Sequence, residues 1–165
     1  MLERSPGLLL QSIPYLGSHR ILKVLTPEHG LISLLAKFAA SRKRSWSALT
    51  TPFLLAEWVY VRGRTDLFLL KDGSLVEPFL ALKDNYGRLA AAGQMAQDLL
   101  KTQMPEKRAE GPFAGAVESF RELAAGKNPA EVLMHFRKML LDWEGLWNEG
   151  TDLKKVHELF EQRLG

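Results

Sequence analysis

The sequence predicts an α+β protein in which an N-terminal OB-type five-stranded β-barrel is followed by a small all-α helical domain. Five short apolar runs, separated by turn residues, occupy the first half and show almost no helical period. From about Leu80 the chain becomes rich in Ala, Leu and Gln, and its apolar residues recur at helical spacing. We therefore expect a barrel domain over residues 1–79 and a helical domain over residues 80–165. An SH3-like barrel has a similar number of strands and stays open as an alternative.

The expected strands span residues 8–15, 19–26, 30–37, 53–62 and 67–77. Pro27 suits the second position of a type I turn, and Gly30 suits its exit, where a positive φ costs little. Lys71-Asp72-Gly73 makes the last run either one bent strand or a small hairpin.

Three helices and a short fourth are expected in the second half. The first begins near Leu80 and ends before Pro105, where a charged run forms a linker; the second covers residues 114–125. Asn128 is a good N-cap for the third helix, Pro129 fits its first position, and Glu131 suits a capping box. A last helix starts near Thr151. The apolar stripe of the third helix consists of Val132, Phe136, Met139, Leu140, Trp143 and Trp147.

Composition excludes several classes of protein. The chain of 165 residues has no cysteine, which removes disulfides, thiolate metal sites and cysteine nucleophiles and suits the cytoplasm. No stretch is long and apolar enough for a membrane span, and the N-terminal region does not resemble a signal peptide. Residues 1–82 carry ten Lys and Arg against six Asp and Glu, whereas residues 83–165 carry twelve against thirteen. This asymmetry indicates that the first half meets a polyanion.

No catalytic motif is present. The sequence lacks a GxSxG elbow, a phosphate-binding GxxxxGK[ST] loop and a GxGxxG motif. His19, His29, His135 and His157 are far apart and lack metal-binding spacing, and no acid pair lies in an apolar setting. We expect no enzyme, no cofactor and no metal.

The candidate site is basic and aromatic. Arg42, Lys43 and Arg44 are adjacent cations on one loop, Lys37 precedes them and Trp46 follows. Cations bind phosphates and aromatic rings stack on bases, so this pattern is typical of a single-strand nucleic-acid binder. In the strand over residues 53–62 we expect one core-like face and a second, ligand-facing one. The second face comprises Leu54, Ala56, Trp58, Tyr60 and Arg62; Arg64 lies just beyond, and Lys23 is a weaker candidate. Packing of Trp58 and Tyr60 against the helical domain is an alternative, as is a solvated loop for the basic cluster.

These residues resemble the bacterial recombination mediator family RecO. The likeness is strongest in SIPYLGSHRILKVLTPEHGLISLLAK and LTTPFLLAEWVYVRGR, and continues in FLALKDNYGRLAAAGQMAQDLL and FRKMLLDWEGLW. It spans residues 7–147, with specific motifs only in the first 65. The resemblance implies an OB-fold that binds single- and double-stranded DNA and a helical domain. It also implies strand annealing and, together with RecR, loading of RecA onto DNA coated by single-strand binding protein.

Two features depart from the family pattern. A four-cysteine zinc module is absent, so no metal is carried over. The basic stretch usual after the third strand is displaced from Lys37 to residues 42–44. The family docks the acidic C-terminal tail of single-strand binding protein, for which an apolar floor with cations is required. Arg121, Arg137 and Lys138 are candidates, and surface ion pairing explains them equally well.

Three function classes remain. The leading hypothesis is a DNA-binding recombination mediator. The runner-up is an OB-fold module that binds RNA or acts as a protein adaptor. A small enzyme on a barrel scaffold is the third, and the sequence offers no good catalytic residue for it.

Overall fold

The barrel is closed, and its strand order identifies the OB topology. In the computed structural model, which describes residues 1–37, 46–146, 158 and 160, the order is β1-β2-β3-β5-β4, with β4 returning to β1. All pairings are antiparallel except that of β3 with β5. This parallel pair closes a five-stranded Greek-key barrel, which confirms the predicted fold class. The strands are β1 (Leu2–Tyr15), β2 (His19–Thr26), β3 (Gly30–Ala36), β4 (Leu54–Arg62) and β5 (Leu67–Glu77).

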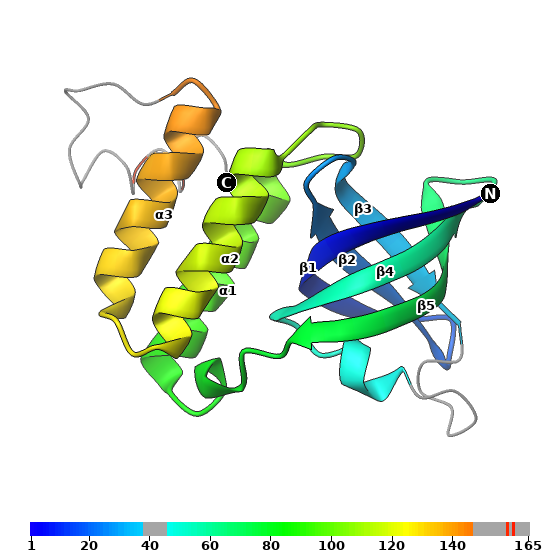
Figure 1. The fold of residues 1–165 in the computed structure, drawn as a ribbon, viewed down its shortest axis with the longest axis horizontal. Helices are drawn as coiled ribbons and strands as arrows, with labels where there is room; N and C mark the ends of the chain where they lie inside the picture. The colour runs from blue at the N-terminus through cyan, green and yellow to red at the C-terminus, as the bar shows by residue number, and fades with distance from the viewer. Residues whose placement is uncertain (38–45, 147–157, 159, 161–165) are drawn as a thin grey trace. The chain divides into compact units, whose positions relative to one another are not determined.

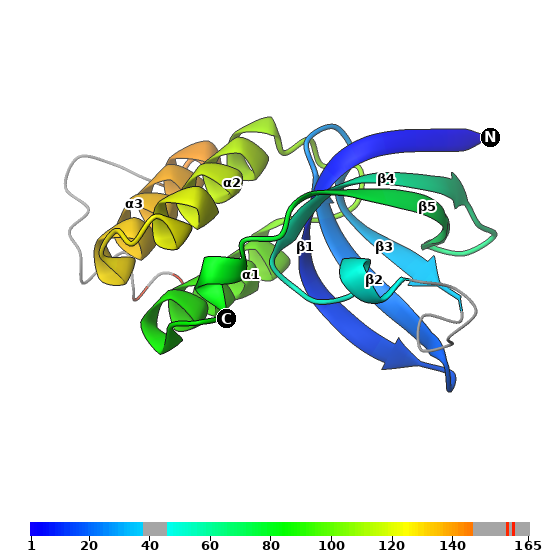
Figure 2. The ribbon, with the colours of Figure 1, turned by 60° about the horizontal axis from the view of Figure 1, so that its bottom comes forward.

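Strand β1 is longer than the sequence predicts because it pairs on both sides. Its first half pairs with β4 and its second half with β2, and the register shifts between Leu9 and Gln11. The views in Figures 1 and 2 show it curving along the barrel wall. The run from Lys71 to Gly73 is not a hairpin. Strand β5 continues through it with a bulge opposite Val59 and Tyr60, which leaves Lys71 without a paired residue.

The barrel core consists of inward-facing side chains from all five strands. Trp58 and Tyr60 are fully buried in it, together with Leu22, Val24, Leu34 and Leu54. The indole Nε1 of Trp58 donates a hydrogen bond to the carbonyl of Gly7 over 3.0 Å, which satisfies the buried donor. A Cβ atom on Gly7 would lie 2.3 Å from Val24 Cγ1, so the close approach of Trp58 to β1 requires glycine.

The chain divides into two compact units. The first comprises Met1–Pro78 and the short segment Met104–Ala109; the second comprises Phe79–Gln103 and Glu110–Gly165. The segment Met104–Ala109, which the sequence presents as a plain linker, is thus part of the barrel unit.

The helical unit contains α1 (Tyr86–Thr102), α2 (Glu110–Ala124) and α3 (Pro129–Trp143), preceded by a 3-10 turn at Leu80–Leu82. Helices α2 and α3 form an antiparallel hairpin and lie side by side in both views (Figures 1 and 2). Asn128 caps α3 as predicted, because its Oδ1 accepts hydrogen bonds from the amides of Ala130 and Glu131. Asn85 caps α1 in the same way. Trp147 and nearly all of the expected last helix lie outside the described residues.

Candidate nucleic-acid interface

The outer face of the barrel carries two rows of partly exposed side chains. The register aligns Gln11, Lys23, Ser33 and Leu67 across β1, β2, β3 and β5, and the next row consists of Ile13, Ile21, Leu35 and Leu69. Lys23 Nζ donates a hydrogen bond to Ser33 Oγ over 2.6 Å. In OB-folds this face of β2 and β3, flanked by loops, is where oligonucleotides bind.

The structure separates the predicted cations along this face. Lys37 is exposed just beyond β3, and Arg64 is exposed in the loop before β5. Because β3 and β5 are parallel, with Ser33 beside Leu67, these two residues lie toward opposite ends of the paired stretch. Arg42, Lys43 and Arg44 lie outside the described residues.

Lys71 is a further exposed cation near the Lys37 end. It is four residues beyond Leu67, as Lys37 is four residues beyond Ser33, and the bulge leaves it unpaired and exposed. Bulges commonly redirect a side chain at a functional edge. The sequence shows Lys71 only as a turn residue, and the bulge has no sequence signal apart from Gly73.

The predicted contacts of Trp46 and Tyr60 with a base are wrong. Tyr60 and Trp58 face the barrel interior at 0% exposure, and Trp46 is buried in the same core at 8%. Strand alternation distinguishes two faces but does not say which one a closed barrel encloses. Tyr60 stacks on Phe68, with ring centroids 5.4 Å apart and planes inclined by 5°. Because Tyr60 is also completely buried, its ring is not available to a base.

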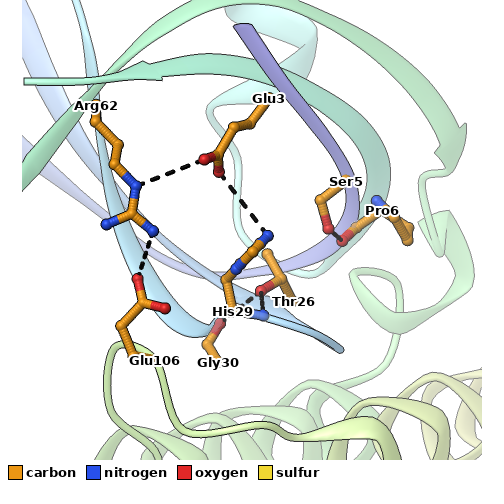
Figure 3. A network of polar contacts seen from close by, with 8 residues as sticks. All are labelled: Glu3, Ser5, Pro6, Thr26, His29, Gly30, Arg62 and Glu106. Atoms are coloured by element: carbon orange, nitrogen blue, oxygen red, sulfur yellow. Dashed lines mark hydrogen bonds and ion pairs between the residues drawn. The ribbon is translucent and has the colours of Figure 1, made fainter. Parts of the chain in front are cut away.

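Arg62 leaves the core face at the end of β4 and enters a polar network (Figure 3). Its Nη2 lies 2.7 Å from Glu106 Oε1, and its Nε lies 3.5 Å from Glu3 Oε1. Its guanidinium carbon also lies over the ring of Phe68, 5.2 Å from the centroid. The hydrogen bond to Glu106 raises the pKa of Arg62 further above its ordinary value. Arg62 is exposed as predicted, but two carboxylates already neutralise it.

Glu3 joins this network to the turn between β2 and β3. Its second carboxylate oxygen lies 3.8 Å from His29 Nε2. The turn itself is held by Thr26, whose hydroxyl donates to the carbonyl of Gly30 and accepts from the amide of His29. Gly30 has a φ of +70°, which confirms the predicted role of glycine at the exit of this turn. His29 thus serves the turn through its main chain while its ring faces Glu3.

Burial shifts the ionisation of Tyr60. Its hydroxyl is buried and has no hydrogen-bond partner among the described residues. Desolvation, with a smaller contribution from the negative charge of Glu3, raises the pKa of Tyr60 to about 12. Tyr60 is therefore neutral at any physiological pH.

A hollow of about 180 Å³ opens beside the loop between β4 and β5. The loop supplies one side and the segment Met104–Ala109 supplies the other. Its lining combines a cation, two acids and one buried aromatic ring. The lining residues are Arg62, Gly63, Thr65, Asp66, Phe68, Pro105 and Glu106.

Main-chain hydrogen bonds hold the segment Met104–Ala109 against the turn between β2 and β3. The amide of Leu31 donates to the carbonyl of Met104, the amide of Glu106 to that of His29, and the amide of Ala109 to that of Pro27. A Cβ atom on Gly30 would lie 2.3 Å from the carbonyl oxygen of Met104. Gly30 is therefore needed both for its φ and for this contact.

Burial and contacts in the helical unit distinguish Arg137 from the other two predicted partner-binding residues. Arg137 is 4% exposed, and its Nε and Nη2 donate to the carboxylate of Asp98 over 2.7 and 3.2 Å. Its guanidinium also lies 5.0 Å from the ring centroid of Phe160. The prediction that Arg137 meets a partner's carboxylate is wrong, because this buried pair joins α1 to α3. Arg121 is exposed and Lys138 is partly exposed.

Comparison with known proteins agrees with the barrel. Residues 1–79 match the family model described as recombination protein O N terminal. Curated relatives named DNA repair protein RecO align beyond it. The relative from Chlamydia pneumoniae is 29% identical over 140 residues, 85% of this chain and 55% of the relative. The relative from Anaeromyxobacter sp. (strain K) is 34% identical over 103 residues, 60% of this chain and 41% of the relative.

The chain is similar to RecO proteins, and its barrel matches their N-terminal domain. A third RecO relative, from Bacillus pumilus, is 27% identical over 146 residues, 88% of this chain and 57% of the relative. The chain spans about half the length of the curated RecO relatives that it matches. Among the helices in the described part of the chain, none is long and apolar enough to cross a membrane.

Proposed function

We propose that the chain is a DNA-binding recombination mediator that acts in DNA repair. In this proposal it anneals complementary strands and, together with RecR and single-strand binding protein, promotes loading of RecA onto single-stranded DNA. The observation that carries the proposal is the match of the RecO N-terminal model to a closed barrel of OB topology. The protein would act in the bacterial cytoplasm, without a metal or an organic cofactor and without catalysing a chemical step.

Residues 1–79 would form the DNA-binding domain. The outer rows of β2 and β3 offer polar and apolar side chains for a DNA strand, with Lys23 in the first row. Cations at both ends of the rows would hold phosphates. They comprise the predicted residues Lys37 and Arg64, to which we add Lys71. The other predicted phosphate contacts are Arg62 and, outside the described residues, Arg42, Lys43 and Arg44. A DNA strand that crosses this face needs cations on both sides of it to bind its phosphates.

Residues 80–165 would bind protein partners. Since Arg137 is committed to Asp98, the acidic tail of single-strand binding protein would have to meet Arg121 and Lys138 instead. Both lie on described helices and differ from Arg137 in being at least partly exposed.

Binding of a labelled single-stranded oligonucleotide across a salt series tests the proposal. We expect micromolar or tighter binding at low salt and a linear fall of log affinity with log salt concentration, because each phosphate contact releases counterions. A matched RNA competitor should displace the DNA poorly. Absence of binding at low salt would contradict the proposal, and equal or stronger displacement by RNA would favour an RNA-binding module.

A further inference from the structure

The hollow beside the β4–β5 loop contains the two groups that a nucleotide of a single strand needs. Arg62 is a fork-shaped donor that matches a phosphate, and Phe68 is an aromatic ring that matches a base. Within the protein, both groups already contact other side chains. Arg62 donates to Glu106 over 2.7 Å, and its guanidinium carbon lies 5.2 Å above the centre of the Phe68 ring. The guanidinium thus occupies the place where a base would stack.

Phe68 is held rigidly in position. Tyr60 stacks on it with nearly parallel planes, and Phe68 belongs to the barrel core at 8% exposure. A ring that is already fixed loses little conformational entropy when a second ring stacks on it. Movement of the Arg62 side chain, which is half exposed, is sufficient to change what covers Phe68.

Glu106 is positioned by its main chain rather than by its side chain. It has a φ of +63°, a conformation that costs a residue other than glycine about 1 kcal/mol. Its amide donates to the carbonyl of His29 over 2.9 Å, and the amide of Lys107 closes a turn onto the carbonyl of Met104. Strain that is maintained by surrounding contacts is common at binding sites. Here it directs a carboxylate at the one cation that lines the hollow.

We propose that the hollow binds one nucleotide of a single strand, with the phosphate replacing Glu106 on Arg62 and the base stacking on Phe68. This inference rests on the proposed DNA-binding function. Glu106 acts as a built-in competitor: it holds Arg62 over Phe68 until a phosphate takes its place. A duplex can use the phosphate half of the site, but its stacked bases cannot reach the ring.

Four variants test the phosphate exchange. Glu106→Gln should tighten binding to a single-stranded oligonucleotide about two- to fivefold, because an exposed ion pair no longer opposes the phosphate. Asp66→Asn removes an exposed acid from the same hollow and is the matched control for general repulsion. Arg62→Gln, alone and combined with Glu106→Gln, separates an effect of Glu106 on Arg62 from a direct repulsion between Glu106 and DNA. If Glu106 acts through Arg62, its replacement should have no effect in the Arg62→Gln background.

Phe68→Leu tests the base contact. We expect at least about fivefold weaker binding to single strands, because the stacking of a base on the ring is lost, and unchanged binding to a duplex. The near-ultraviolet circular dichroism of the variant shows whether the core is intact. Equal losses on single strand and duplex with an intact core would overturn the base contact.

The outcomes separate this inference from the proposed function. A wild-type chain that binds no DNA contradicts the function itself. A chain that binds DNA equally well with and without Glu106, or that gains as much from Asp66→Asn as from Glu106→Gln, contradicts only the inference. The comparison of Glu106→Gln with its double variant does not depend on Phe68, so it remains decisive if Phe68→Leu fails to fold.

Discussion

At the scale of single residues, Tyr60 shows how the barrel uses a side chain that the sequence presents as a ligand contact. Its ring fills the core, stacks on Phe68 and leaves the hydroxyl buried without a partner among the described residues. An unpaired buried hydroxyl has a desolvation cost that its ring packing must offset. Tyr60 is therefore a core residue with an unpaired hydroxyl. Its ring stacks on Phe68, over which Arg62 lies.

Tyr60→Phe should leave the unfolding free energy at pH 7 unchanged or raise it slightly, because it removes the unpaired hydroxyl and keeps the ring. Urea unfolding measures this difference. A loss of more than about 1 kcal/mol would mean that the hydroxyl has a partner after all.

Stability should fall between about pH 10 and 12. The pKa of Tyr60 is about 12 in the folded chain and near 10 when unfolded, so in this window the folded state keeps a proton that the unfolded state has lost. The contribution of Tyr60 to the unfolding free energy amounts to about 2–3 kcal/mol. It is fully present below pH 10 and is lost as the pH rises through 12. Tyrosinate absorbance should show a late-titrating group that Tyr60→Phe abolishes. A titration in which Tyr60→Phe removes no late-titrating group would contradict the burial.

At the scale of elements, the turn between β2 and β3 binds the segment Met104–Ala109. One glycine makes this possible, since Gly30 combines a φ of +70° with an approach of carbonyl oxygens that leaves no room for a Cβ. The elements joined there are far apart in sequence and meet through main-chain hydrogen bonds.

Gly30→Ala should destabilise the barrel by about 1–3 kcal/mol, from the left-handed conformation and the overpacking together. The loss of stability should be confined to this turn and the segment Met104–Ala109. Hydrogen exchange at the amides of Leu31, Glu106 and Ala109 should accelerate more than exchange in β4. Gly17→Ala is the control, because Gly17 also has a positive φ but has open space around its Cβ position. Equal effects at both positions would mean that conformation alone matters.

The pairing of Asp98 with Arg137 is the corresponding link between α1 and α3. Arg137→Met should lower the unfolding free energy by about 3–5 kcal/mol, because it removes the arginine that pairs with a buried carboxylate. Adding Asp98→Leu should restore most of this loss, since an apolar pair can replace a buried ion pair. Thermal unfolding measures both, and Lys101→Met on the exposed side of α1 is the control. A double variant as unstable as the single one would argue against the pairing.

At the scale of the whole molecule, the net positive charge lies in the first half of the chain, as the sequence shows directly. Its candidate centre is the triplet Arg42, Lys43 and Arg44, for which the only basis is the sequence. Solution measurements can test this triplet.

Replacing all three by Ala should weaken binding of every DNA sequence to a similar degree. The slope of log affinity against log salt concentration should fall by about 2, because single strands release about 0.7 counterion per phosphate contact. A control variant with Lys83, Lys101 and Lys127 changed to Ala removes the same charge from exposed positions of the helical unit. An unchanged slope in the loop variant, or an equal change in the control, would mean that the loop does not contact phosphate.

Local patterns predicted the elements well and long-range contacts poorly. The bounds of β2 and the cap of α3 follow from turn and capping residues, which act over a few positions. The early start of β1 depends on pairing with β4, more than fifty residues away, and no local pattern encodes it. The interior position of Tyr60 and the buried state of Arg137 depend on closure of the barrel and on a partner in another helix. The sequence therefore predicted a candidate site of charged and aromatic residues. It did not predict the hydrogen bonds and ion pairs that hold them.

The position of Met104–Ala109 also bears on how the barrel is made. Protein is synthesised from the N-terminus, and domains generally fold as units while the chain emerges from the ribosome. The family match ends at residue 79, but the barrel unit gains its last piece only after all of α1 has emerged. The carbonyls of Pro27 and His29 must remain without these partners until then. A nascent chain that has emerged from the ribosome only as far as a point between residues 79 and 103 would thus carry a barrel that is closed by its strands but unsealed at the turn between β2 and β3.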